Sequence, residues 1–136
     1  MNNLSKWCVI GAGPSGLTAL KNLLQCNIQA ECLEREDDLG GNWYFGSSTS
    51  RVFESTRLIS SKSLTEFTDF PMPREWPAYP DHRQCLDYLH RYSEHFGLGN
   101  HILFQKSVAR ITPLQRDNIR MGWCVELEDG TTRSYA

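Results

Sequence analysis

The run Gly11-Ala12-Gly13-Pro14-Ser15-Gly16, near the start of this 136-residue chain, constrains its fold more than any other feature. A short apolar run over residues 6–10 precedes it, and leucines recur at helical spacing over residues 17–24. In a strand–turn–helix unit, the first glycine permits a tight turn, the second lets backbone approach a pyrophosphate, and the third lets helix and strand pack closely. The run therefore predicts a phosphate site on the free amides at the start of a helix, although glycines in an ordinary tight turn are the alternative.

A second predicted strand, residues 30–34, ends on a carboxylate. Glu34 lies eighteen positions after Gly16, where a carboxylate can accept hydrogen bonds from both hydroxyls of an adenosine ribose. The same charge repels a 2′-phosphate, so FAD or NAD is favoured over NADP at this site. Glu34 could instead be a solvated member of the acidic run 34–38. The strand–glycine–helix–strand context favours the binding role, and the residues alone predict a dinucleotide-binding βαβ unit.

Composition excludes several other classes of protein. The net charge of −2 and pI near 6.1 give no basic surface for nucleic acid, and no apolar run approaches the ~20 residues of a membrane span. The N-terminus lacks the apolar region of a signal peptide. Five scattered cysteines without a CxxC pair predict mostly buried thiols in a reducing, cytoplasmic setting, and argue against a disulfide reductase. The histidines show no metal-ligand spacing, and we expect no metal site.

The remaining pattern completes an α/β chain. A short helix is expected over residues 62–67, followed by a proline-rich stretch that Trp76 and Tyr79 pack down, and then a helix capped by Asp81 that runs to about Phe96. Residues 102–104 predict a third parallel strand, with the first strand in the middle of the sheet. An antiparallel excursion over residues 108–112, 123–127 and 131–134 turns at Asp129-Gly130. Because such a sheet needs a further strand, we expect an N-terminal piece of a longer protein.

A second pair of glycines, in Gly40-Gly41-Asn42-Trp43, again brings backbone close to a ligand. With the first glycine run and the strand-ending pair Glu34-Arg35, it makes the sequence resemble the flavin-containing monooxygenase family. The resemblance continues through Ser60-Ser61-Lys62, residues 69–73 and the helix from His82 to Phe96, and so covers essentially the whole chain.

The resemblance implies an α/β, Rossmann-like FAD-binding domain with a parallel sheet and an antiparallel β-excursion, truncated at its C-terminus. Residues 1–136 would be its N-terminal part, without the NADPH-binding domain or the last strand of the FAD domain. The implied FAD contacts are Gly11, Ala12, Gly13, Pro14, Ser15, Gly16, Glu34, Arg35, Gly41, Asn42, Trp43, Ser60 and Ser61. No catalytic side chain is assigned, since the flavin carries the chemistry.

The family uses NADPH and molecular oxygen to oxygenate nitrogen or sulfur atoms of small molecules through a C4a-hydroperoxyflavin. A Baeyer–Villiger monooxygenase or another FAD/NAD(P)H oxidoreductase is an alternative, and a non-catalytic nucleotide-binding fragment is another. One position departs from the family pattern: Ile59 stands where members commonly carry an asparagine beside the reactive edge of the flavin. An isoleucine donates no hydrogen bond there, although Ser60 or Ser61 could supply one.

Overall fold

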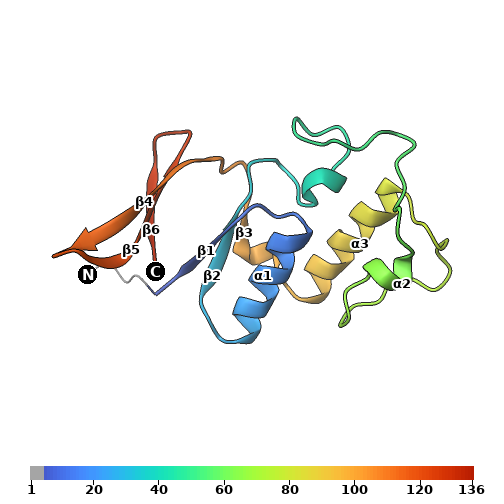
Figure 1. The fold of residues 1–136 in the computed structure, drawn as a ribbon, viewed down its shortest axis with the longest axis horizontal. Coiled ribbons are helices and arrows are strands. Elements are labelled where there is room, and N and C mark those ends of the chain that lie inside the picture. The colour runs from blue at the N-terminus through green and yellow to red at the C-terminus, as the bar shows by residue number, and fades with distance from the viewer. Residues whose placement is uncertain (1–4) are drawn as a thin grey trace.

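The first three elements of the chain form the βαβ unit that the sequence predicts. In a computed structural model that describes residues 5–136, β1 (Trp7–Ile10) leads into α1 (Pro14–Gln25) and then β2 (Ala30–Leu33) (Figure 1). Pro14 starts the helix, where its missing N–H costs nothing. Leu17 and Leu20 are fully buried against the sheet, and β2 is buried along its whole length. The prediction about a signal peptide rests partly on residues 1–4, which lie outside the described range.

The strand order differs from the prediction. β2 lies in the middle, paired in parallel with β1 on one side and with β3 (Ile102–Leu103) on the other. The expectation that the first strand is central is therefore wrong for residues 5–136. After β3 the chain leaves for a second sheet, so no described segment covers the other edge of β1. Trp7 and Ile10 are consequently 49% exposed, where a buried strand was expected.

The segment after β2 contains little regular structure. η1 (Gly41–Trp43) is one turn of 3₁₀ helix, and α2 (Lys62–Thr65) is slightly shorter than predicted. The Lys62 ammonium donates hydrogen bonds to the carbonyl oxygens of Pro73, Arg74 and Trp76 at 2.8, 2.8 and 2.6 Å. These bonds gather the proline-rich stretch around one side chain. Trp76 packs against the core as expected, whereas Tyr79 is 51% exposed because that stretch turns it outward.

α3 (His82–His95) begins at the predicted N-cap. The Asp81 carboxylate accepts a hydrogen bond from the Gln84 amide, and the Gln84 side chain accepts one from the Asp81 amide. Gly97, with φ +66°, follows the end of the helix. The buried face of α3 carries Tyr88 and Tyr92 into an aromatic cluster that also contains Phe67, Phe70 and Phe96.

The antiparallel excursion is confirmed, and it is longer than predicted. η2 (Gly99–His101) and β3 lead into β4 (Val108–Arg116), β5 (Ile119–Leu127) and β6 (Thr132–Tyr135), which form a separate sheet in that order. In Figure 1 this sheet lies at the opposite end of the molecule from α2 and α3. A hairpin at Asp117-Asn118, both with positive φ, joins β4 to β5, and the predicted turn at Asp129-Gly130 joins β5 to β6.

The cysteines are all free but less uniformly buried than expected. Cys32 and Cys85 are buried, Cys8 and Cys124 are half-buried, and Cys26 is exposed at the end of α1. Burial raises the pKa of both the Cys32 and Cys85 thiols to about 12, so they stay protonated at neutral pH. Within residues 5–136, no helix combines the length and the apolar character needed to cross a membrane.

Candidate nucleotide-binding site

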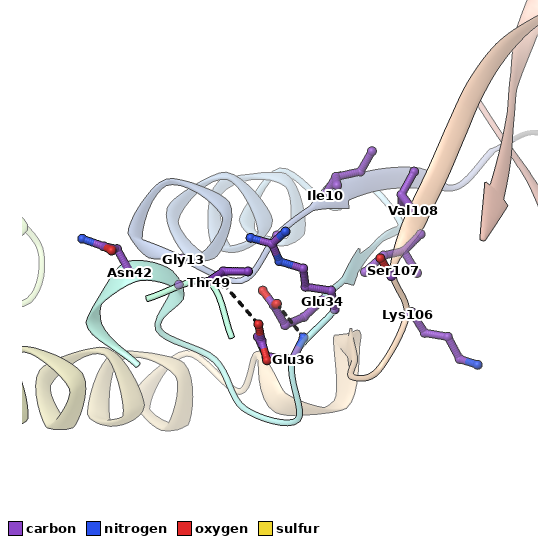
Figure 2. A pocket seen from close by; sticks show the side chains of 13 residues that line it. Ile10, Gly13, Glu34, Glu36, Asn42, Thr49, Lys106, Ser107 and Val108 are labelled. Atoms are coloured by element: carbon purple, nitrogen blue, oxygen red, sulfur yellow. Dashed lines mark hydrogen bonds between the residues drawn. The ribbon is translucent and has the colours of Figure 1, made fainter. Parts of the chain in front are cut away.

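A cavity of about 420 Å³ opens at the carboxyl ends of β1 and β2, beside the start of α1 (Figure 2). This edge of a parallel sheet is where open α/β folds bind ligands. Six of the predicted site residues line it: Gly11, Gly13, Glu34, Arg35, Gly41 and Asn42. Seven more lining residues were not predicted: Ile10, Leu33, Glu36, Thr49, Lys106, Ser107 and Val108.

The first and third glycines of the turn have the geometry that the sequence predicts. Gly11 has φ +91°, which side chains rarely permit, and its amide donates to the Leu33 carbonyl at 2.8 Å. A Cβ on Gly16 would lie 1.8 Å from the Gly11 carbonyl oxygen. Since that oxygen belongs to backbone, only glycine allows α1 to start so close to the end of β1.

The two glycine loops, far apart in sequence, touch each other at the cavity. A Cβ on Gly41 would lie 3.0 Å from the Gly13 Cα, and one on Gly13 would lie 3.6 Å from the Gly41 Cα. The Gly40 amide donates to the Ala12 carbonyl at 2.9 Å, and this bond fixes one loop against the other. The contact leaves a cavity wall of bare backbone, which a ligand can approach closely.

The start of α1 carries no side-chain cap. Gly13 occupies the N-cap position, and no side chain of residues 5–136 caps the first turn. Pro14 has no N–H, so the amides of Ser15 and Gly16 are those that an α-helix leaves without an internal partner. Free amides at the positive end of a helix dipole are suited to an anion such as phosphate.

Glu34 is buried at the end of β2, with 5% of its surface exposed. One carboxylate oxygen accepts the Ala12 amide at 2.6 Å. The other accepts the Glu36 amide at 2.9 Å, as Figure 2 shows. Within residues 5–136, no lysine or arginine forms an ion pair with Glu34. A carboxylate offers about four lone-pair positions, so this arrangement leaves acceptor capacity at the cavity. Ala12, which was predicted to contact FAD, is fully buried and does not line the cavity. Its amide instead orients the Glu34 carboxylate.

The loop after β3 forms the far wall of the cavity. The Lys106 amide donates to the Glu34 carbonyl at 2.8 Å, and the Gln105 amide donates to the Glu36 carbonyl at 3.0 Å. These bonds bring Lys106, Ser107 and Val108 to the carboxyl end of β2. The Lys106 side chain extends away from Glu34 in Figure 2, and its ammonium lies 3.4 Å from the Asp129 carboxylate. The position of this loop directly after the third predicted strand was the signal that could have identified it.

The other predicted site residues do not line this cavity. Pro14, Ser15 and Gly16 lie in the first turn of α1, and Trp43 packs against the hydrophobic core. Ser60 and Ser61 precede α2, where their hydroxyls bond to Thr65 at 2.7 Å and to Ser63 at 3.1 Å. Ile59 beside them is 100% exposed. A flavin contact at these positions stays a prediction.

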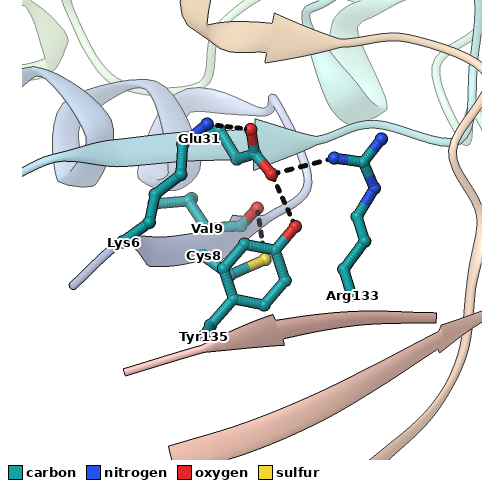
Figure 3. Close-up of polar contacts among 6 residues, drawn as sticks. All are labelled: Lys6, Cys8, Val9, Glu31, Arg133 and Tyr135. Carbon is teal, nitrogen blue, oxygen red and sulfur yellow. Dashed lines mark hydrogen bonds and ion pairs between the residues drawn. The ribbon is translucent and has the colours of Figure 1, made fainter. Parts of the chain in front are cut away.

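A second buried carboxylate, Glu31, lies within β2 and away from the cavity (Figure 3). It accepts hydrogen bonds from the Lys6 ammonium, from the Tyr135 hydroxyl at 2.6 Å and from Arg133 at 3.2 Å. Burial tends to raise the pKa of Glu31, but the bonds from Lys6 and Tyr135 outweigh it, so the pKa lies below its ordinary value of 4.5. Glu31 thus joins the parallel sheet to β6 of the antiparallel sheet.

Comparison with known proteins agrees with this geometry. The profile of the family described as "FMO-like: Flavin-binding monooxygenase-like" matches residues 5–133. The chain belongs to this family. It is 36% identical over 131 residues to flavin-containing monooxygenase 1 of Oryctolagus cuniculus, covering 93% of this chain and 24% of that protein. It is 37% identical over 111 residues to dimethylaniline monooxygenase (N-oxide-forming) 4 of Rattus norvegicus, covering 79% of this chain and 20% of that protein.

Two solved structures of oxygenases share the fold. S-allyl-L-cysteine S-oxygenase from Allium sativum superposes with a TM-score of 0.82 at 24% identity, over 95% of this chain and 34% of that one. Open cyclohexanone monooxygenase gives a TM-score of 0.81 at 23% identity, over 96% of this chain and 25% of that one. At these identities the likeness is one of fold. The chain spans about a quarter of the length of the curated relatives it matches.

Proposed function

We propose that this chain is the FAD-binding portion of a flavin-dependent monooxygenase. One observation carries the proposal: a helix start and a buried carboxylate meet at the same cavity, and no described residue caps the one with its side chain or forms an ion pair with the other. The residues fit a dinucleotide, because Gly13 and Gly41 line the cavity with backbone alone, which a ligand can approach closely. In this proposal the free amides of Ser15 and Gly16 hold the phosphates, and Glu34 accepts the ribose hydroxyls.

The remaining predicted contacts keep supporting roles in the proposal. Arg35, Gly41 and Asn42 line the cavity beside Glu34, while Trp43, Ser60 and Ser61 would reach the flavin outside it. When bound, FAD supplies the redox chemistry, and the protein binds it, orients it and excludes water around it. No side chain of residues 5–136 is assigned a proton-transfer step.

The full-length protein is proposed to oxidise NADPH and to transfer oxygen to nitrogen or sulfur atoms of small molecules. The sequence identity of 36–37% to proteins named as flavin-containing and N-oxide-forming monooxygenases supports oxygen transfer to nitrogen or sulfur. Baeyer–Villiger oxygenation is the alternative, since the fold is shared with cyclohexanone monooxygenase. A non-catalytic nucleotide-binding role is a further alternative for the chain by itself.

The test is to purify the full-length protein with stoichiometric FAD and record its flavin absorbance. NADPH and NADH consumption is then followed with an amine, a sulfide and a ketone, and products are identified by mass spectrometry. We expect retained FAD, a preference for NADPH, and an N-oxide or S-oxide product. An ester product would favour Baeyer–Villiger chemistry, and a protein that binds no FAD would overturn the proposal.

Ile59 supplies a prediction within this proposal. Its apolar side chain is fully exposed, and it replaces a residue that in the family would donate a hydrogen bond near the flavin. We expect the full-length protein to release peroxide during NADPH oxidation, and Ile59→Asn to lower peroxide release per NADPH. Tight coupling of NADPH to product in the unmodified protein would show that Ile59 does not limit oxygen transfer.

A further inference from the structure

A polar segment, Ser47-Ser48-Thr49-Ser50-Arg51, crosses one side of the candidate cavity and is tied to its walls. We call residues 47–51 the strap. The first contact is with Glu36, one of whose carboxylate oxygens accepts the Ser48 hydroxyl at 2.7 Å and the Thr49 hydroxyl at 3.1 Å. We call these two hydrogen bonds the clasp. Figure 2 shows Thr49 reaching toward Glu36 beside Glu34. Two hydroxyl bonds thus converge on one charged acceptor, a strong type of hydrogen bond.

The second contact is with the glycine loop. The Asn42 side-chain oxygen accepts the Arg51 amide at 2.7 Å, and the Asn42 carbonyl accepts the Ser50 hydroxyl at 2.9 Å. The strap is therefore fixed at both ends to residues that line the cavity. Thr49, which belongs to the clasp, is itself part of the cavity lining.

Glu36 is well placed to be an anchor because its own backbone is held twice. Its amide donates to Glu34 at 2.9 Å, and its carbonyl accepts the Gln105 amide at 3.0 Å. The clasp therefore connects the strap with the buried carboxylate Glu34 and with the loop after β3. The strap, by contrast, contains no helix or strand, and Ser48 and Arg51 are exposed. Segments held by a few exposed hydrogen bonds are those that open locally.

We propose that Glu36 is a positioning residue that holds the strap across the cavity and thereby sets how fast a bound flavin leaves. This inference rests on the proposed FAD site and adds a retention device to it. Glu36 acts through Ser48 and Thr49, so its hydrogen-bonding capacity is what matters. Release of the flavin requires the clasp to open, and loss of the clasp makes release faster.

The test measures FAD dissociation from the full-length holoprotein, as the rise in flavin fluorescence after dilution. Glu36→Ala removes the acceptor and is expected to speed dissociation by about tenfold. Glu36→Gln keeps an oxygen that accepts both hydroxyls, and is expected to stay within about threefold of the unmodified protein. The matched control is Glu75→Ala, an exposed carboxylate without a side-chain hydrogen bond among the described residues, which should change nothing.

The partner side of the clasp gives an independent variant. Ser48→Ala combined with Thr49→Val should speed FAD release as much as Glu36→Ala does. Adding both changes to Glu36→Ala should then have no further effect, because all three remove the same interaction. Trypsin cleavage after Arg51 provides a readout apart from the flavin: it should be faster in Glu36→Ala than in Glu36→Gln.

The possible outcomes separate the two proposals. An unmodified protein that binds no FAD would overturn the FAD site itself. FAD binding with unchanged release and unchanged cleavage in Glu36→Ala would overturn the clasp alone. If Glu36→Gln releases FAD as fast as Glu36→Ala, charge at the cavity and not the clasp governs retention, and the inference is wrong. Should Glu36→Ala fail to fold, the variant of Ser48 and Thr49 decides the question.

Discussion

Two buried carboxylates, Glu31 and Glu34, lie three positions apart at β2, yet their surroundings differ completely. Glu31 is 7% exposed and is surrounded by Lys6, Arg133 and Tyr135. Glu34 is 5% exposed, and among residues 5–136 its carboxylate accepts hydrogen bonds from two backbone amides only, at the edge of a cavity. The two residues are buried to a similar extent, so what distinguishes them is which groups donate hydrogen bonds to each carboxylate.

The difference shows how a buried carboxylate can be assigned a structural or a binding role. Cations neutralise Glu31 and use its acceptor capacity, so it holds β1, β2 and β6 together. Backbone amides orient Glu34 without neutralising it, which leaves a charged acceptor beside the uncapped start of α1. Buried charges are costly unless partnered, and the binding role that we propose for Glu34 would account for a buried carboxylate without a cationic partner among residues 5–136.

The largest expected effect comes from removing the structural carboxylate. Glu31→Ala leaves the Tyr135 hydroxyl buried without its acceptor and two cations without their partner. We expect the full-length protein to lose about 3 kcal/mol of stability, the lower end for a broken buried pair, because Lys6 and Arg133 can turn to water. Urea unfolding measures the loss. FAD affinity of the folded protein should stay the same, and Glu126→Ala, an exposed carboxylate on β5, is the control.

Removing the binding carboxylate should have the opposite signature. Glu34→Ala is expected to weaken FAD binding by about 1.5–3 kcal/mol, since it deletes a charge-assisted acceptor for the ribose hydroxyls. The measurement is FAD occupancy at limiting flavin in the full-length protein. Unchanged occupancy would contradict the assignment, and Glu34→Gln, which keeps the size of the side chain, separates loss of charge from loss of packing.

The sequence predicted Glu34 because its position is defined by local pattern. Strand, glycine turn and helix lie within one stretch of chain, and their spacing places the carboxylate at the end of β2. Glu31 was missed because its partners come from residues 6, 133 and 135, and no local pattern encodes such distant contacts. Thr49 and the loop after β3 were missed at the cavity for the same reason.

The errors in the fold also come from non-local effects. The order of the strands depends on which edge of β1 finds a partner, and periodicity carries no information about that. β4 continues through Pro113, beyond the predicted end at residue 112, because a proline is tolerated on an edge strand such as β4. The start of α1 after the glycine turn and the Asp81 cap of α3 were predicted correctly, because the residues that determine them are neighbours in sequence.

We expect acid to lower the stability of the protein in part by protonating Glu31. The folded pKa of Glu31 lies below 4.5, so its contribution to stability is complete above that pH and is lost as the pH falls through the folded pKa. The difference in unfolding free energy between the unmodified protein and Glu31→Gln should therefore be largest near neutral pH and shrink below about pH 4.5. A difference that stays constant down to pH 3 would show that the charge of Glu31 contributes nothing.

The smallest expected effect isolates one bond of the Glu31 cluster. Burial and then the bond to Glu31 raise the pKa of Tyr135, so its hydroxyl stays protonated and donates to the carboxylate. Tyr135→Phe removes that donor but leaves both cations in place, and should cost about 1 kcal/mol of stability. Thermal unfolding of the full-length protein measures this. In a background of Glu31→Ala the same change should cost less, because the hydroxyl has already lost its acceptor. Equal costs in both backgrounds would show that Tyr135 acts by packing alone, and that the cations suffice to hold Glu31.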